Sequence, residues 1–273
     1  MASLFAVLRV LLLILFTLLL LPFHLLLLLF APKSANKSAC LWHIVSSWTL
    51  GVRTKVSGRP QPGPVLYLCN HVSWLDIIIL SRAAPLSFVA KADVAAWPVF
   101  SWLAKWQRTI FVERERRSKT AVAIDAMVER LESHDALVLF PEGTSSEGWG
   151  ILPFKSALIG AVVATAARLE DQHDVDLFVQ PVALAYTHLK GIALGRMEAD
   201  RAAWIGDVDL VPHLWSVITT GGLQAHIVFG DPVEVNPDTN RKILAKQMEA
   251  EVLKQLEQAR KPGRQHSKTN GSL

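Results

Sequence analysis

The feature that most constrains the fold is a regular alternation of strand-like and helix-like segments that begins after Gly58 and ends near Lys261. Alternation of this kind predicts an α/β fold, with a mixed sheet covered by helices. The predicted strands are Val65–Cys69, Ser87–Ala90, Thr109–Val112, Ala136–Phe140, Leu177–Ala185 and Ala225–Phe229. The predicted helices are Asp76–Arg82, Asp93–Trp106, Ser118–Ser133, Pro153–Leu169 and Pro237–Arg260.

The limits of this domain follow from composition. A turn-rich connector over residues 58–64, rich in Gly and Pro, precedes the first strand, so we expect the α/β domain to occupy residues 58–260. The last helix has Asn236 as its expected N-cap and Pro237 at its first helical position. Residues 261–273 are mostly polar and are predicted to be a disordered tail.

The N-terminal part is much more apolar than the rest and contributes to an apolar content of 51% and a mean hydropathy of +0.30. Val10–Ala31 is about as long as a membrane-spanning helix needs to be. A helix broken at Pro22 and dipping into one leaflet is a second interpretation. A cleaved signal peptide is a third, with residues 35–39 as a loose cleavage site. We expect residues 1–57 to form membrane-associated helices.

Two later apolar segments have two interpretations each, as part of the core or as a membrane-contacting surface. Leu41–Val52 either lies at the headgroup level or forms a core helix of the domain. The aromatic stripe of Asp93–Trp106, which Pro98 interrupts, is either core or a lipid-contact surface.

Charge and cysteine content narrow the possible partners. The net charge of +4 and the pI of about 9.1 suit either ordinary solubility or attraction to an anionic membrane face and to phosphate-bearing substrates. We expect no nucleic-acid partner. Cys40 and Cys69 are the two cysteines, and Cys69 lies in a predicted buried strand, so a reducing compartment fits better than a disulfide framework. The nine His and two Cys show no metal-ligand spacing.

A first polar cluster, residues 70–76, directly follows the predicted strand Val65–Cys69. The ends of buried strands are where α/β folds place active sites. His71 is a candidate general base and Asp76 its orienting partner. Five residues of regular helix would put them about 140° apart, so His71 should lie in the turn before the helix. A helix N-terminus capped by polar residues is the competing interpretation.

The same His-x4-Asp spacing occurs at His226 and Asp231. There the histidine opens an apolar, strand-like run, and residues 230–232 read as a turn. We assign this second pair to structure.

A second cluster, Phe140-Pro141-Glu142-Gly143-Thr144, follows another predicted strand. It is either a simple strand-to-helix turn or an acceptor site, in which a carboxylate and backbone N–H groups bind hydroxyls and a polar headgroup. Arg114, at the end of a predicted strand, is a candidate for an anionic headgroup. Pro181 interrupts a buried strand and predicts an edge or a bulge.

These motifs, in this order, resemble the phospholipid/glycerol acyltransferase family over roughly Gly58 to Val235. The family has four sequence blocks. They match Asn70, His71 and Asp76; then Phe111 and Arg114; then Phe140 to Thr144; and then the segment around Pro181.

The resemblance implies roles for the matched residues. It implies His71 as base and Asp76 as its partner, with the second and third blocks binding the acceptor and Pro181 near the acyl or catalytic side. It places Lys91 at the acceptor headgroup. The acceptor-binding set is therefore Lys91, Phe111, Arg114, Glu142, Gly143 and Thr144, with Asn70, Ser145, Lys155 and Pro181 as further candidates.

The resemblance also implies a setting. The family has an N-terminal helical hairpin embedded in one leaflet, for which Pro22 is the expected break, and we expect the cytoplasmic face of a bacterial-type inner membrane. The acyl donor is acyl-CoA or acyl carrier protein, with no other cofactor.

Two departures concern the headgroup. Members that act on lysophosphatidic acid commonly carry Arg soon after the third block's Thr, where this chain has Ser145 and Ser146. The Gly often found in the second block is also absent. Residues 144–148, 152–158 (which include Lys155), 204–207 and 212–215 resemble the bacterial branch that acylates lyso-ornithine lipid.

The leading hypothesis is a membrane-bound O-acyltransferase that moves a fatty acyl chain to the free hydroxyl of a lysolipid, 1-acylglycerol-3-phosphate or a related one. A lyso-ornithine lipid O-acyltransferase is the alternative. A non-catalytic membrane lipid-binding protein is the alternative of another class. A serine hydrolase is disfavoured because Gly-x-Ser-x-Gly is absent.

Overall fold

The computed structural model describes residues 2–92, 98–112, 117–169, 176–206 and 208–261. The strands are β1 (Val52–Ser57), β2 (Val65–Cys69), β3 (Ser87–Lys91), β4 (Ile110–Val112), β5 (Ala136–Leu139), β6 (Phe178–Leu189), β7 (Ile192–Ala193), β8 (Leu223–Phe229) and β9 (Val233–Glu234). The helices are α1 (Ala2–Phe30), α2 (Pro32–Thr49), α3 (Leu75–Ser81), α4 (Pro98–Trp106), α5 (Arg117–Glu132), α6 (Gly160–Leu169), the 3-10 helix η2 (Arg196–Arg201), α7 (Leu210–Thr220) and α8 (Arg241–Arg260).

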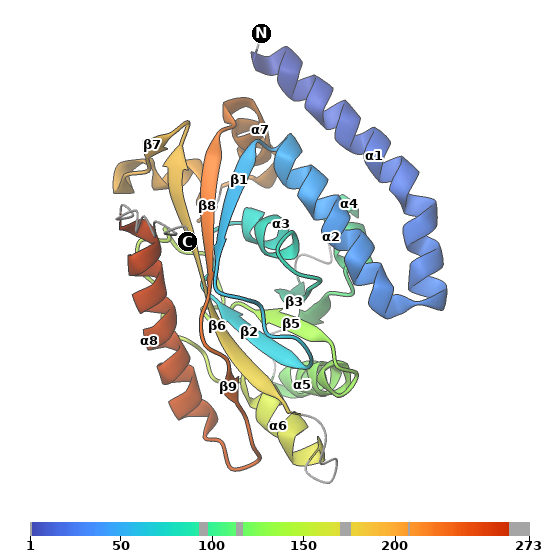
Figure 1. Ribbon diagram of the computed structural model, residues 1–273, viewed down its shortest axis with the longest axis vertical. Helices are drawn as coiled ribbons and strands as arrows, with labels where there is room; N and C mark the ends of the chain where they lie inside the picture. Colours follow the sequence, from blue (N-terminus) through green and yellow to red (C-terminus); the bar gives the residue numbers. More distant parts are fainter. Residues whose placement is uncertain (1, 93–97, 113–116, 170–175, 207, 262–273) are drawn as a thin grey trace, which may run out of the picture.

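The strands of the described residues form one mixed sheet in the order β1-β8-β6-β2-β5-β3-β4, and β7 and β9 pair with β6 (Figure 1). β2 runs parallel to both β5 and β6, whereas β6 and β8 are antiparallel. All five residues of β2 are buried, as expected of a parallel strand that is covered on both faces. The predicted mixed sheet covered by helices is therefore confirmed.

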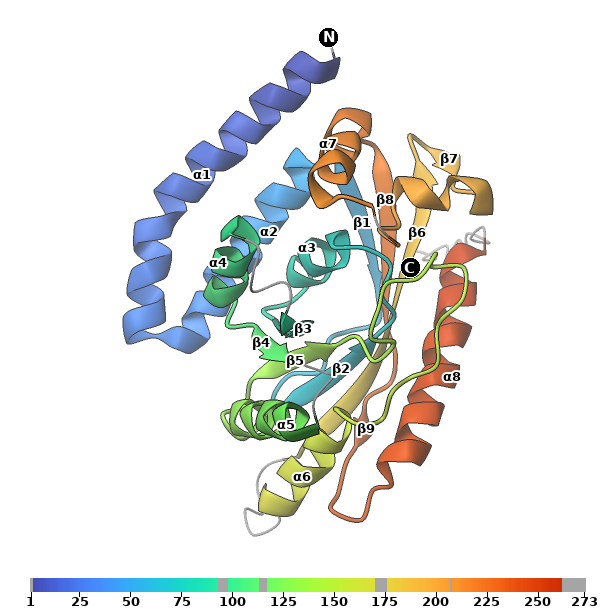
Figure 2. The ribbon, with the colours of Figure 1, turned by 180° about the vertical axis from the view of Figure 1, so that it is seen from behind.

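Alternate residues of β2 supply two separate cores. Tyr67 and Cys69 point to the face that carries α3, where they pack with Ile79 and Phe88. Leu66 and Leu68 point to the opposite face, which is covered by α5, α6 and α8 (Figures 1 and 2). The strand order thus fixes a stable central sheet whose strand ends can carry a site.

The N-terminal segment is a helical hairpin of α1 and α2, and α2 packs against α3 (Figure 1). The expectation that the hairpin breaks at Pro22 is wrong, because Pro22 lies inside α1 and the chain reverses at Ala31. Pro32, at the start of α2, explains the reversal: proline disfavours helical backbone at the residue before it but suits the first helical position.

Several boundaries differ from prediction. The helix expected from Pro153 begins at Gly160, and the helix expected from Pro237 begins at Arg241. Its N-cap is Asn240, whose side chain accepts hydrogen bonds from two backbone N–H groups of the first turn. β1, β7, β9, η2 and α7 were not predicted, and the sheet begins at Val52, ahead of the connector at Gly58. The expected tail and the start of the expected helix Asp93–Trp106 lie outside the described residues, apart from Lys261.

Pro181 lies in β6, which pairs on both sides, so an edge position is wrong. Val179 pairs with Val233 of β9, and Val182 pairs with Phe229 of β8, so two residues of β6 face three on the other side. Pro181 therefore lies opposite the loop that joins β8 to β9, where the ladder is interrupted. The register shift of β6 against β8 lies between Tyr186 and His188, not at the proline. Cys40 and Cys69 are free thiols.

Candidate active site

The site lies where the parallel strands β2, β5 and β3 end at one edge of the sheet. Asn70 and His71 follow β2, Phe140 follows β5, and Lys91 is the last residue of β3. The polar clusters of the sequence therefore meet at the carboxyl ends of neighbouring strands, as expected for this class of fold.

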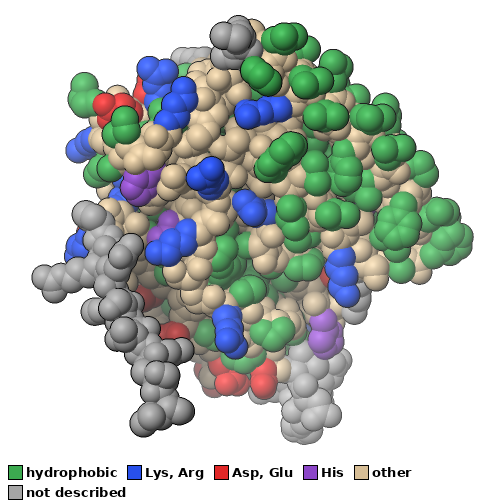
Figure 3. Space-filling model, turned by 45° about the horizontal axis from the view of Figure 1, so that its top comes forward, with side chains coloured by type: hydrophobic (Ala, Val, Ile, Leu, Met, Phe, Trp, Pro, Cys, Tyr) green, Lys and Arg blue, Asp and Glu red, His purple; other side chains and the backbone are tan. Residues whose placement is uncertain are grey.

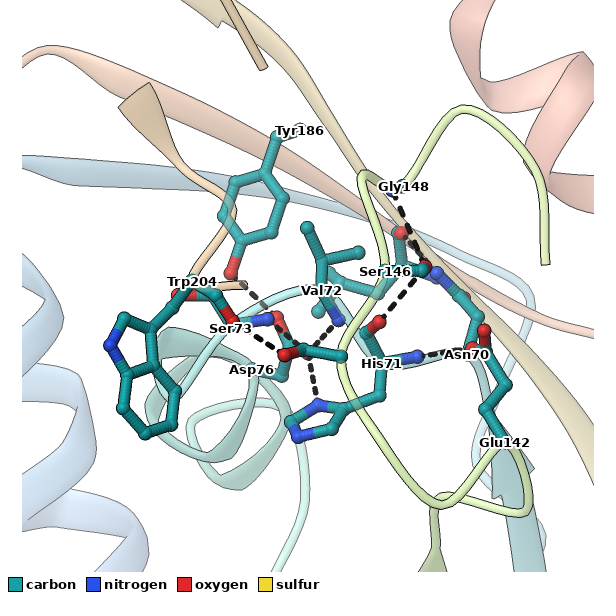
Figure 4. A network of polar contacts seen from close by, with 12 residues as sticks. Asn70, His71, Val72, Ser73, Asp76, Glu142, Ser146, Gly148, Tyr186 and Trp204 are labelled. Carbon is teal, nitrogen blue, oxygen red and sulfur yellow. Dashed lines mark hydrogen bonds and ion pairs between the residues drawn. The ribbon is translucent and has the colours of Figure 1, made fainter. Parts of the chain in front are cut away.

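His71 lies in the turn before α3, as predicted, and its Nδ1 is 2.8 Å from Oδ2 of Asp76 (Figure 4). The ring stacks on Phe140 with a centroid distance of 4.2 Å. A carboxylate accepts the Nδ1–H, so the tautomer leaves Nε2 as the ring atom that can take a proton. The side chain of His71 is 21% exposed, whereas that of Asp76 is fully buried. This is the arrangement of a general base and its orienting carboxylate.

The buried carboxylate of Asp76 is held by four donors. Besides His71, the backbone N–H groups of Val72 and Ser73 donate to Oδ2 at 2.7 and 3.0 Å. The phenol of Tyr186, on β6, donates to Oδ1 at 2.7 Å (Figure 4). A buried charge needs such compensation for its lost hydration. Tyr186 was missed in the sequence because it lies 110 residues from Asp76 inside an apolar strand.

Asn70 holds the backbone of the site in place, and its side chain is bonded to a neighbouring strand. Its side-chain amide donates to the carbonyl of Leu184 at 3.0 Å and accepts from the N–H of Leu184 at 2.8 Å. This pair of bonds fixes the end of β2 to β6, immediately before His71.

Glu142 has a different place from the one expected. Its buried carboxylate accepts the backbone N–H of His71 and that of Leu152, both at 2.7 Å. Burial raises the pKa of Glu142. Glu142 therefore joins the third block to the turn of residues 70–74, called the catalytic turn below, and it is not among the residues that line the cavity described next. Ser146 adds two bonds to the carbonyl of His71, from its N–H at 2.8 Å and its hydroxyl at 3.1 Å (Figure 4).

A cavity of about 670 Å³ opens beside His71 and runs between the sheet edge and the helices α1, α2, α3 and α4. Much of its lining is apolar. The residues of the site cluster that border it are His71, Trp74, Lys91, Phe140, Gly143, Thr144, Ser145, Trp204, Gly206 and Leu210. A largely apolar cavity with a candidate base in its lining fits an acyl chain whose reactive end lies at His71.

The other predicted site residues fall into those that border the cavity and those that do not. Gly143 and Thr144 border the cavity, and Gly143 has a φ of 83°, which favours glycine. Lys91 is exposed and also borders it. Phe111, Lys155 and Pro181 do not line it, and Arg114 lies outside the described residues. Within the described part of the chain, no group of three or more His, Cys, Asp or Glu could hold a metal ion.

Comparisons with known proteins agree with this geometry. The model of the family described as Acyltransferase matches residues 53–185. The lyso-ornithine lipid O-acyltransferase of Brucella abortus is 42% identical over 80% of this chain and 81% of its own. The enzyme of that name from Rhizobium meliloti is 39% identical over 84% and 78%. The 1-acyl-sn-glycerol-3-phosphate acyltransferase of Neisseria gonorrhoeae is 30% identical over 81% of both chains.

A solved structure shares the fold. The acyltransferase PlsC of Thermotoga maritima superposes with a TM-score of 0.64 at 20% identity, covering 96% of this chain and 99% of its own. The resemblance found in the sequence motifs is confirmed by these matches. The chain belongs to the acyltransferase family that includes the lyso-ornithine lipid and 1-acylglycerol-3-phosphate O-acyltransferases.

Proposed function

We propose that this protein transfers a fatty acyl chain from a thioester to the hydroxyl of lyso-ornithine lipid. The observation that carries the chemistry is the imidazole of His71, which Asp76 orients through Nδ1 and which borders a largely apolar cavity. The acceptor is inferred from the relatives at 42% and 39% identity.

The reaction follows from the geometry. The acceptor hydroxyl loses its proton to Nε2 of His71 as its oxygen attacks the thioester carbonyl. Asp76 stabilises the imidazolium that forms. The tetrahedral intermediate then collapses, the carbon–sulfur bond breaks, and the thiolate takes the proton back from His71. The acyl group ends as an ester on the acceptor, and no protein nucleophile takes part.

The described residues that line the cavity include one cation, Lys91, and no carboxylate side chain. The ornithine headgroup carries one carboxylate and one ammonium and has no net charge, whereas a phosphate monoester carries up to two negative charges. A lining with a single lysine therefore suits the ornithine headgroup better. Ser145 and Ser146 add hydroxyl groups, not charge, after Thr144. From the block pattern we also assign Phe111 and Arg114 to the acceptor side.

The surface supports a membrane location. The candidate span Ser3–Phe30 contains an 18-residue window with a mean hydropathy of 3.0, and 6% of that window is buried. Figure 3 shows apolar side chains gathered on the face that carries this hairpin, and Trp48 of α2 is 69% exposed. We infer that residues 1–57 associate with the bilayer, and that β1 nevertheless belongs to the sheet of the acyltransferase domain. We propose acyl-CoA or acyl carrier protein as the thioester donor. Because both donors are cytoplasmic, we also propose that the site faces the cytoplasm at a bacterial-type inner membrane.

An acyl-transfer assay tests the proposal. The purified full-length protein in mixed micelles is given labelled acyl-CoA or acyl-loaded carrier protein, with lyso-ornithine lipid, lysophosphatidic acid or lysophosphatidylcholine as acceptor. Preferred transfer to lyso-ornithine lipid is the expected result. Transfer to lysophosphatidic acid alone would overturn the acceptor assignment but not the chemistry. Lipid binding without transfer to any acceptor would favour the binding-protein alternative.

A further inference from the structure

The segment after η2, which sequence reasoning did not place, docks directly onto the catalytic turn. Ala202 and Ala203 are buried in the core on the α3 side of the sheet. The backbone N–H of Trp204 then donates to the carbonyl of Val72 at 3.0 Å, one residue after His71. We name residues 202–206 the Trp204 wall, because Trp204 and Gly206 border the cavity.

A second bond holds the Trp204 wall from the other side. The hydroxyl of Ser145 donates to the carbonyl of Trp204. The next residue, Ser146, is bonded to the carbonyl of His71. Hydrogen bonds therefore join the wall, the catalytic turn and the two serines that follow the third block, and Ser145 is the side chain that links these serines to the wall.

The indole of Trp204 is itself held in place. Its Nε1–H donates to the carbonyl of Val208 at 2.7 Å, so the side chain lies against its own loop. Next to it, Nε1 of Trp74 donates to Nδ1 of His213 at 2.9 Å, which attaches the following helix α7 to the catalytic turn. The two tryptophans border the same cavity as Gly143, Thr144 and Ser145.

We propose that Ser145 is a positioning residue that holds the Trp204 wall against the acceptor end of the cavity, and so determines which lysolipid headgroups enter. A hydroxyl on one methylene is short enough to reach the carbonyl while the wall stays in contact with Val72. A long cationic side chain at position 145 would occupy the space of that carbonyl. The inference rests on the proposed function only in taking the acceptor to be a lysolipid.

The proposed role of Ser145 predicts different effects on the acceptor and on the acyl donor. The thioester carbon must approach His71 whatever the headgroup, whereas the wall lies beside Thr144 and Ser145, which we assign to the acceptor. Loosening the wall should therefore change the KM for the acceptor and the choice among acceptors. It should leave the KM for the acyl donor nearly unchanged, which a merely structural role would not.

The test compares Ser145→Ala with Ser145→Thr, which keeps the hydroxyl. The matched control is Ser133→Ala, because the hydroxyl of Ser133 also donates to a backbone carbonyl, that of Glu129, at the remote end of α5. KM for each substrate, kcat and Tm are measured with the full-length proteins, using the acceptor that the wild type prefers. Loss of one such hydrogen bond is expected to raise the acceptor KM of Ser145→Ala about three- to tenfold.

The same series includes the ratio of kcat/KM for lyso-ornithine lipid and lysophosphatidic acid, which should fall toward one in Ser145→Ala and in Ser145→Arg. Ser145→Thr should restore both the KM and the ratio, and Ser133→Ala should match the wild type. An unchanged acceptor KM and ratio in Ser145→Ala would overturn the inference. So would an equal rise in both KM values, or a fall in Tm with no selectivity change.

The role of Ser145 can be tested even if the proposed function is wrong. A wild type that uses only lysophosphatidic acid overturns the lyso-ornithine assignment, and the acceptor KM of Ser145→Ala is then read on lysophosphatidic acid. If the wild type turns over no acceptor, the Kd of each lysolipid, measured by calorimetry, replaces the KM. An unchanged Kd in Ser145→Ala would then overturn the role of Ser145.

Discussion

The chain contains two histidines that are followed five residues later by an aspartate, and their surroundings are opposite. His71 and Asp76 lie in a turn and the first turn of α3, with Nδ1 and Oδ2 2.8 Å apart. His226 lies inside β8, and Asp231 lies in the loop beyond it. A strand advances about 3.3 Å per residue, so extended backbone carries the second aspartate away from its histidine. His226 shares a hydrogen bond with Ser57 of β1 instead.

The difference shows that spacing alone does not make a catalytic pair. The side chains of the first pair meet because the backbone turns between them and places two N–H groups, those of Val72 and Ser73, on the carboxylate. Sequence reasoning separated the two pairs correctly because the residues around His226 are typical of a strand. The predictions below use the second pair, and other matched residues, as controls for the first.

The largest effect is expected from removing the base. His71→Ala should lower kcat/KM by about 10²–10⁴-fold, because it removes the imidazole that we propose takes the proton from the acceptor hydroxyl. His226→Ala should stay within about threefold of the wild type, since it removes a hydrogen bond far from the cavity. The measurement is acyl transfer by both variants at equal concentration. An active His71→Ala, with the host's own acyltransferases excluded, would contradict the assigned base.

The orienting carboxylate should come next. Asp76→Asn places an amide where a carboxylate accepts from His71, so part of the population loses the productive tautomer, and activity should fall about 100-fold. Asp231→Asn, at an exposed loop, should leave activity unchanged. Circular dichroism and Tm of both variants check that the fold is intact. Equal activity of the two variants would contradict the assigned role of Asp76 as the carboxylate that orients His71.

A smaller loss is expected at Glu142, whose carboxylate bonds to the turn and which is not among the described residues that line the cavity. Glu142→Gln replaces one of its two acceptor oxygens by an N–H donor, which then faces a backbone N–H of His71 or Leu152. We expect kcat to fall about tenfold through displacement of the turn. Glu249→Gln is the matched control, because Oε2 of Glu249 accepts the N–H of Phe154 at 2.6 Å, away from His71. A rise in acceptor KM with unchanged kcat in Glu142→Gln would show instead that Glu142 binds the acceptor.

What the sequence predicts well is what local pattern encodes. Val65–Cys69 is correct at both ends because five apolar residues between turn signals can only be a short buried strand here. The placing of His71 before α3 followed from helix geometry. The hairpin break was misplaced because proline inside a long apolar helix is tolerated, while Pro32 marks the actual reversal.

Contacts between segments that are distant in the sequence could not be predicted from local sequence patterns. Tyr186, Ser146 and the Trp204 wall approach the catalytic turn from segments more than 70 residues away, and no local pattern reports their pairing. The role of Glu142 could have been suspected, since a carboxylate between two strand ends often accepts orphan backbone N–H groups. The block pattern of the family instead suggested an acceptor contact.

Tyr186 offers a milder test of the same carboxylate. Tyr186→Phe removes the donor to Oδ1 of Asp76 and should lower kcat about three- to fivefold without changing either KM. Tyr67→Phe is the control, because Tyr67 is equally buried and its phenol donates at 2.8 Å to the carbonyl of Gln61. A Tyr67→Phe variant with the larger loss of activity would show that the effect is one of folding, not of the catalytic pair.

The smallest effect concerns pH. Nε1 of Trp74 can only donate, so Nδ1 of His213 must be unprotonated, and burial lowers the pKa of His213 below 6.5. The histidine therefore contributes stability that is fully present above pH 6.5 and is lost as the pH falls through that value toward the lower pKa of the folded state. Burial lowers the pKa of His226 as well, with a contribution from Lys55. Both histidines should thus make Tm fall on acidification from about pH 7.5 to 5.5.

The two histidines differ in what the protonation disturbs. Charging His213 places an N–H against the N–H of Trp74, which borders the cavity next to the catalytic turn, whereas His226 bonds to Ser57 at the far strand β1. His213→Phe and His226→Phe should each flatten the dependence of Tm on pH. Only His213→Phe should also change the acidic limb of the kcat/KM profile, by about twofold or less. A change in that limb caused by His226→Phe instead would mean that the second His-x4-Asp pair is coupled to catalysis after all.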